Sequence, residues 1–114
     1  MKFVKLLILV LNKVDKLDKL LKEFASQHVT GATIVNSRGM ARELMNKDEL
    51  NIIGSFRQLL DVNRKESKTI FMVVKEEKVE QVVAIIENIV GSLDQPDTGI
   101  LFTTPIDFIR GYKQ

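Results

Sequence analysis

The segment that decides the fold is FVKLLILVL, Phe3–Leu11, which is apolar along nearly its whole length. A run of this length without alternation is typical of a strand that is covered on both faces. An amphipathic helix is expected to follow and to end near His28, with apolar side chains at helical spacing at Val14, Leu17, Leu20, Leu21 and Phe24. Gly31 then allows a turn into a second strand, the β-branched Ala32–Asn36. Residues 2–37 therefore predict a β-α-β unit.

The same pattern occurs again in residues 68–104. A third strand is predicted over Lys68–Val74 and a fourth over Gly99–Thr104, with Pro105 marking its end. The apolar stripe of the helix between them consists of Val79, Val82, Val83, Ile86, Ile89 and Val90. Two β-α-β units with right-handed crossovers give an α+β fold, the ferredoxin-like βαββαβ plait, with the first and third strands central. Those two strands are also the most apolar, in agreement with this topology.

An insert, Arg38–Ser67, separates the two units and contains glycine, arginine and mixed charge. Its apolar residues suit a helical turn or two near Met40, and a second short helix or a strand between Ile52 and Leu60. A long loop in a compact domain is usually either functional or partly disordered. The alternative, that these apolar residues only hold the loop to the core, carries equal weight.

Both helices of a plait pack on one face of the sheet, so the other face lies open to water. Phe3–Leu11 and Ile70–Val74 alternate poorly, and this predicts an apolar open face as well. Exposed apolar patches of several hundred Å² mark interfaces. We therefore predict a homo-oligomer assembled through the open sheet face. The short apolar tail, with Ile106, Phe108 and Ile109, is expected to dock on the domain.

The composition indicates one globular domain spanning residues 1–114. Apolar residues make up 45% and charged residues 28%, which excludes a disordered chain. The net charge of +2, from 17 basic and 15 acidic residues, is too balanced to predict nucleic-acid binding. The absence of cysteine fits a cytoplasmic protein. Phe3–Leu11 is far shorter than the ~20 residues that span a membrane, so no membrane insertion is expected.

Catalytic and metal-binding patterns are weak in this sequence. There is one histidine, His28, and no cysteine, so a zinc or copper site and a catalytic role are both disfavoured. Asp94 and Asp97 suit turn geometry better than a cation site. We therefore expect no catalytic residue, no metal and no enzymatic activity.

Cationic loops beside glycines are the stronger signal. Arg38 and Arg42 flank Gly39, where backbone amides and guanidinium groups suit a phosphate or carboxylate. A second glycine turn, Asp97–Gly99, enters the fourth predicted strand. The alternative for the arginines is a solvated face, or ion pairs with Glu43, Asp48 and Glu49.

Over nearly its whole length the chain resembles the PII family of nitrogen-regulatory signalling proteins. The run Gly31–Arg42 is similar to the family's Gly-x-Thr-Val strand and the Gly-Phe-Gly-Arg entry to its T-loop. Thr33, Gly39 and Arg42 match without gaps, whereas Met40 and Ala41 replace Phe and Gly. Thr98–Phe102 falls where the family has its B-loop, Gly-Asp-Gly-Lys-Ile-Phe.

The resemblance implies a homotrimer whose inter-subunit clefts bind an adenine nucleotide such as ATP, ADP or AMP, and whose loop, residues 38–67, signals to a target protein. The ligand residues it implies here are Thr33, Arg38, Gly39, Met40, Ala41, Arg42, Asp97, Thr98 and Gly99. Two departures stand against triphosphate binding. Ile100 replaces the B-loop lysine, and the C-terminal Arg-x-Arg-Thr-Gly-Glu is missing. A different nucleotide, another small anion, or no ligand at all therefore stays open, and no cofactor is assigned.

Two other functions share this fold. One is a small plait-fold enzyme, which the almost wholly aliphatic predicted core disfavours because such a site needs titratable groups. The other is a CutA-like trimer, for which one histidine and no cysteine provide little metal-binding chemistry. The sequence favours a small-effector sensor that signals to an unidentified partner protein.

Overall fold

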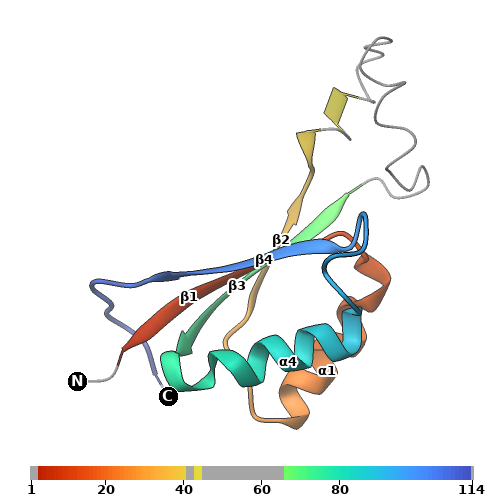
Figure 1. Cartoon of the computed structure of the whole chain (residues 1–114). Helices are drawn as coiled ribbons and strands as arrows, with labels where there is room; N and C mark the ends of the chain where they lie inside the picture. The colour runs from red at the N-terminus through yellow and green to blue at the C-terminus, as the bar shows by residue number, and fades with distance from the viewer. Residues whose placement is uncertain (1–2, 41–42, 45–65, 114) are drawn as a thin grey trace.

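The computed structural model describes residues 3–40, 43–44 and 66–113. Ala41, Arg42 and most of the predicted insert lie outside these residues. Four strands, β1 (Val4–Leu11), β2 (Thr33–Ser37), β3 (Ser67–Lys75) and β4 (Gly99–Pro105), form one antiparallel sheet. Two helices, α1 (Leu17–Ser26) and α4 (Val79–Val90), follow short 3-10 turns, η1 (Val14–Lys16) and η2 (Glu76–Lys78). Both helices lie on the same side of the sheet (Figure 1).

The strand order is β2-β3-β1-β4, which confirms the prediction that the first and third strands are central. β1 pairs with β3 on one side and with β4 on the other, and β2 closes the far edge of β3. The chain therefore has the predicted α+β ferredoxin-like fold. Each strand boundary lies within two residues of its expected position, because strand ends depend on pairing partners as well as on apolar runs.

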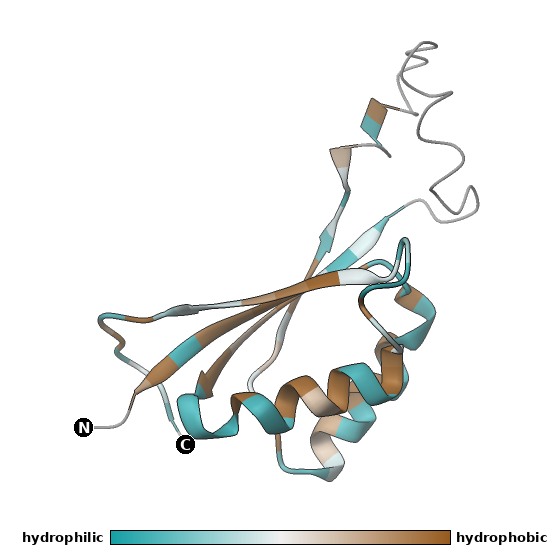
Figure 2. Cartoon of the chain, in the orientation of Figure 1, coloured by the Kyte–Doolittle hydropathy of each residue, from teal (hydrophilic) through white to brown (hydrophobic). Residues whose placement is uncertain are grey.

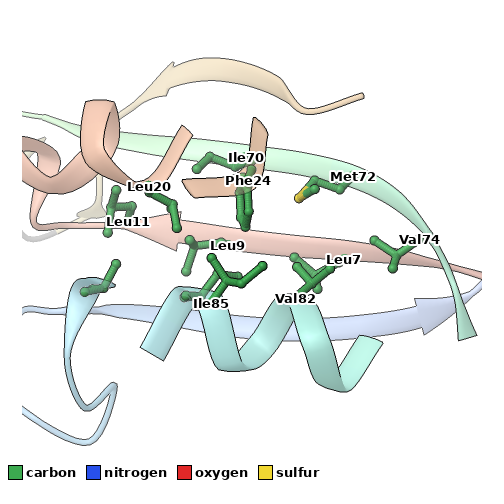
Figure 3. Packing of buried hydrophobic residues seen from close by; sticks show 12 residues of the cluster. Leu7, Leu9, Leu11, Leu20, Phe24, Ile70, Met72, Val74, Val82 and Ile85 are labelled. Carbon is green, nitrogen blue, oxygen red and sulfur yellow. The ribbon is translucent and has the colours of Figure 1, made fainter. Parts of the chain in front are cut away.

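The core lies between the sheet and the two helices. Leu7, Leu9 and Leu11 of β1 point into it because alternate strand residues face the same side. The other buried apolar side chains are Ile70, Met72 and Val74 of β3, Leu20 and Phe24 of α1, and Val82, Ile85, Ile86 and Val90 of α4. Figure 3 shows these side chains converging from β1, β3 and the helices. At about 25 cal/mol per Å² of buried apolar area, this layer is the main stabilising contribution to the fold.

The face of the sheet away from the helices is the open face, formed by the residues between the core positions on each strand. It is apolar, as expected, and Figure 2 shows that β1 is hydrophobic along most of its length. Its side chains include Leu6, Ile8 and Val10 on β1, Phe71 and Val73 on β3, Val35 on β2, and Ile100 and Phe102 on β4. Val35 is 45% exposed, Ile100 58% and Phe102 46%. A single chain thus leaves large apolar side chains in water on this face.

The C-terminal tail departs from the expected docking. Phe108 is 72% exposed and Ile109 is 38% exposed, while Ile106 is half-buried. The Phe108 ring contacts the guanidinium of Arg110, whose Cζ lies 5.2 Å from the ring centroid. The expectation that all three apolar residues dock is wrong for Phe108, whose side chain stays exposed. No helix among the described residues is long and apolar enough to cross a membrane.

Candidate functional site

The predicted ligand residues divide between two edges of the sheet. One row of paired residues crosses all four strands, with Asn36 opposite Lys68, Lys68 opposite Leu11, and Leu11 opposite Gly99. Arg38–Met40, just after β2, and Asp97–Gly99, just before β4, therefore lie at the same end of the sheet. Because β3 and β1 separate them, three strand spacings, roughly 14 Å, lie between the two groups.

Thr33 lies apart from both groups. It is exposed at the first position of β2, where it pairs with Phe71. Four residues of strand, about 13 Å at 3.3 Å per residue, separate it from Ser37 at the other end of β2. Among the described residues, one chain therefore does not bring the predicted ligand residues into a single site.

Hydrogen bonds between side chains hold the point where the chain leaves β2. The Ser37 hydroxyl lies 2.8 Å from the hydroxyl of Ser67 and 2.8 Å from that of Thr69. Ser67 and Thr69 are only 2% and 9% exposed. Beside them Lys68 donates to the Asn36 side-chain carbonyl. These contacts fix the direction in which Arg38 and Gly39 leave the sheet.

Arg38 forms an ion pair after leaving β2, which is one of the alternatives raised by the sequence. Its Nη1 lies 2.9 Å from Glu43 Oε2, and both side chains are about half exposed. A backbone bond from Glu43 N to Gly39 O, 3.0 Å, starts a helical turn that brings the two charges together. A ligand contacted by Arg38 must therefore share its guanidinium with Glu43 or displace that carboxylate.

The Asp97–Gly99 turn is built onto the end of β1. The Thr98 carbonyl accepts from Asn12 N at 3.0 Å and from Lys13 N at 3.4 Å. Thr98 is 1% exposed and its hydroxyl faces the Pro96 carbonyl at 3.5 Å. The backbone of this turn, and not the Thr98 side chain, is what the chain presents at this edge.

A pocket of about 470 Å³ lies at the opposite end of the sheet, and the sequence did not predict it. It is bounded by the α1–β2 connection, the end of β3, the start of α4 and the C-terminal tail. Its lining residues are His28, Val29, Thr30, Gly31, Met72, Val73, Val74, Lys75, Lys78, Val82, Ile109, Arg110, Gly111, Tyr112 and Lys113. Periodicity cannot reveal such a site, because it depends on where an irregular tail comes to rest. Within the described residues no group of three or more His, Cys, Asp or Glu side chains is placed to hold a metal ion.

Solved structures resemble this one at low sequence identity. A functionally unknown protein from Pediococcus pentosaceus aligns with a TM-score of 0.67 and 15% identity, covering 98% of this chain and 100% of that one. A structure of Arabidopsis thaliana PII bound to citrate aligns with a TM-score of 0.60 and 19% identity, covering 92% of this chain and 78% of that one. At these identities the two structures support the fold alone.

Comparison with curated proteins gave no match. The family model for nitrogen regulatory protein P-II, in contrast, matches residues 4–112. This range contains all four strands, both helices and both glycine turns. The chain belongs to the P-II family.

Proposed function

We propose that this P-II family protein is a regulatory homotrimer that binds a small effector between its subunits. The effector is an adenine nucleotide or another small anion. Residues 38–67 transmit its presence to a partner protein. The observation that carries the proposal is the division of the described ligand candidates between the two edges of one sheet, with Thr33 at the other end of β2. A second copy of the chain supplies the missing half of the effector site more simply than any rearrangement of a stable sheet.

The open face supports assembly. Burying Ile100 and Phe102 together with the central strand residues of that face removes apolar surface from water, at about 25 cal/mol per Å². Because this face continues to the Asp97–Gly99 turn at the start of β4, an interface formed there lies beside the turn. Effector binding and assembly are thus coupled in this proposal.

The replacement of the family's B-loop lysine by Ile100 bears on the choice of effector. A charge-assisted hydrogen bond contributes about 1.5–3 kcal/mol, so its loss lowers affinity for a triphosphate more than for a nucleotide with fewer charges. We therefore expect AMP or ADP to compete with ATP on nearly equal terms. The measurement is calorimetric titration with the three nucleotides, and a strong preference for ATP would contradict this expectation.

Phe102→Lys tests the coupling of effector binding to assembly. A charge at this half-exposed position on the open face should give a folded monomer that no longer binds the effector. Thr103→Lys is the matched control, since Thr103 is exposed on the same strand and faces the other way. The proposal fails if the Phe102→Lys monomer binds nucleotide as well as the wild type.

Affinity purification tests the partner protein. The full chain is compared with a variant in which a short glycine-serine linker replaces residues 45–65, and the variant should lose the partner that the full chain retains.

A further inference from the structure

The chain places one of its own carboxylates on the arginine that follows β2. Arg38 is the first residue after this strand, and its Nη1 donates to Glu43 Oε2 at 2.9 Å. Glu43 is held a second time, because its backbone N donates to the Gly39 carbonyl oxygen at 3.0 Å. One residue therefore closes a turn of the backbone and also occupies the guanidinium at the entry to the loop.

The contact between Arg38 and Glu43 is accessible to a solute. Their side chains are 51% and 43% exposed, and Met40, which lies between them in sequence, is 72% exposed. None of residues 38–40 belongs to the apolar core. Figure 1 shows β2 carrying this end of the chain away from α1 and α4. An ion pair this exposed contributes little to stability, so a better ligand for the arginine can break it.

The strand end before Arg38 is held more firmly. The Ser37 hydroxyl lies 2.8 Å from each of the hydroxyls of Ser67 and Thr69, both of which are buried. On the other face of the sheet, Lys68 donates to the Asn36 side chain. A change at Arg38 therefore moves the turn that follows it and leaves the paired ends of β2 and β3 in place.

A bound anion and Glu43 exclude each other at this guanidinium. Arg38 carries one positive charge, which Glu43 already balances. A phosphate or carboxylate group placed on the same guanidinium lies close to the Glu43 carboxylate, and like charges a few Å apart repel each other. Because Glu43 is about half exposed, its carboxylate can turn into water instead. An anion on Arg38 therefore releases Glu43 and does not share the arginine with it.

We propose that Glu43 makes an autoinhibitory contact. In the free chain its carboxylate occupies the position on Arg38 that the anionic group of the effector takes, and an effector that displaces it also releases the first turn of the loop. This inference rests on the proposed function and adds a means of regulation at the same site. It makes the affinity for the effector lower than Arg38 alone would give.

Glu43→Gln tests the contact, because glutamine keeps the size of the side chain and removes its charge. Isothermal titration of the full chain with AMP and with citrate should show tighter binding of the preferred anion than in the wild type, by up to about fivefold for an ion pair this exposed. The gain should shrink as salt is raised, because salt screens exposed charges. Glu87→Gln is the matched control, since it removes a negative charge from an exposed position on α4 that has no ion pair among the described residues.

Hydrogen exchange provides a second measurement, and it needs no effector. In Glu43→Gln the amide of residue 43 should exchange faster than in the wild type, because the ion pair no longer supports its bond to Gly39. The amides of β3 should keep their protection in both proteins. Saturating anion should accelerate exchange at residue 43 in the wild type and should change little in the variant.

The outcomes separate this inference from the proposed function. Equal affinities of Glu43→Gln and wild type for the anions would overturn the autoinhibition and leave the proposed effector in place. An equal gain in Glu87→Gln would also overturn it, because net charge would then be the cause. Tighter binding with unchanged exchange at residue 43 would overturn the release of the loop. Binding of neither anion to any variant would remove the proposed effector, and with it the inhibition of its site.

Discussion

At the scale of single residues, Gly99 is where the turn before β4 packs against the central strand β1. Its φ is 156°, and a Cβ at this position would lie 2.6 Å from the Val10 carbonyl oxygen. Backbone cannot yield as a flexible side chain does, so any larger residue pushes the turn away from β1. Asp97, two residues earlier, has a φ of 56°, so the turn reaches β4 through two unusual backbone conformations.

Gly99→Ala is therefore expected to destabilise the domain by about 1–3 kcal/mol, the usual cost of overpacking. Gly39→Ala is the control, because a Cβ there meets nothing within 4 Å. Urea unfolding followed by circular dichroism measures both variants. Equal midpoints for Gly99→Ala and wild type would show that the turn does not depend on this close approach.

The sequence predicted which residues are candidates for the site, but not what surrounds their side chains in the structure. The cationic loop beside a glycine located Arg38 and Gly39, yet the ion pair of Arg38 with Glu43 depends on a helical turn inside the insert. The resemblance to the P-II family included Thr98 among the ligand residues, and the structure buries its side chain. A motif specifies which residue occupies a position, whereas exposure depends on neighbours that the motif does not contain.

At the scale of elements, the hydroxyl cluster of Ser37, Ser67 and Thr69 joins β2 to β3. β2 is otherwise an exposed edge strand, with Ile34 and Val35 38% and 45% exposed. It contributes no side chain to the fully buried core among the described residues. The buried hydroxyl contacts therefore hold the edge strand in register where apolar packing is sparse.

Ser37→Ala removes the partner of both other hydroxyls. At about 0.5–1.5 kcal/mol for each hydrogen bond, the expected loss of stability is roughly 1–3 kcal/mol. Hydrogen exchange of the β2 amides should accelerate while that of α4 stays unchanged, because the change is confined to the edge of the sheet. Thr104→Ala, on the exposed part of β4, is the control, and uniform acceleration across both elements would contradict a local role.

The regular elements were predictable because periodicity and burial determine them together. The run Phe3–Leu11 and the stripe Val79–Val90 each bury one face against the same core, so β1, β3, α1 and α4 followed from apolar spacing alone. The strand order followed from the handedness of crossovers. The pocket was not predictable in this way, because it joins His28–Gly31 to a tail about eighty positions later that follows no repeating pattern.

At the scale of the whole molecule, two separate features support the proposed assembly of more than one copy of the chain. The open face leaves Ile100 and Phe102 about half exposed, and the predicted ligand residues sit at separated positions of one sheet. The proposed trimer, assembled through the open face, accounts for both.

Native mass spectrometry of the full chain with and without AMP tests the central claim most directly, because it reports assembly and ligand stoichiometry together. We expect a species of three times the 13.0 kDa chain mass that carries up to three nucleotides in its inter-subunit clefts. A species of 13.0 kDa at micromolar concentration, whether or not it carries a nucleotide, would contradict it.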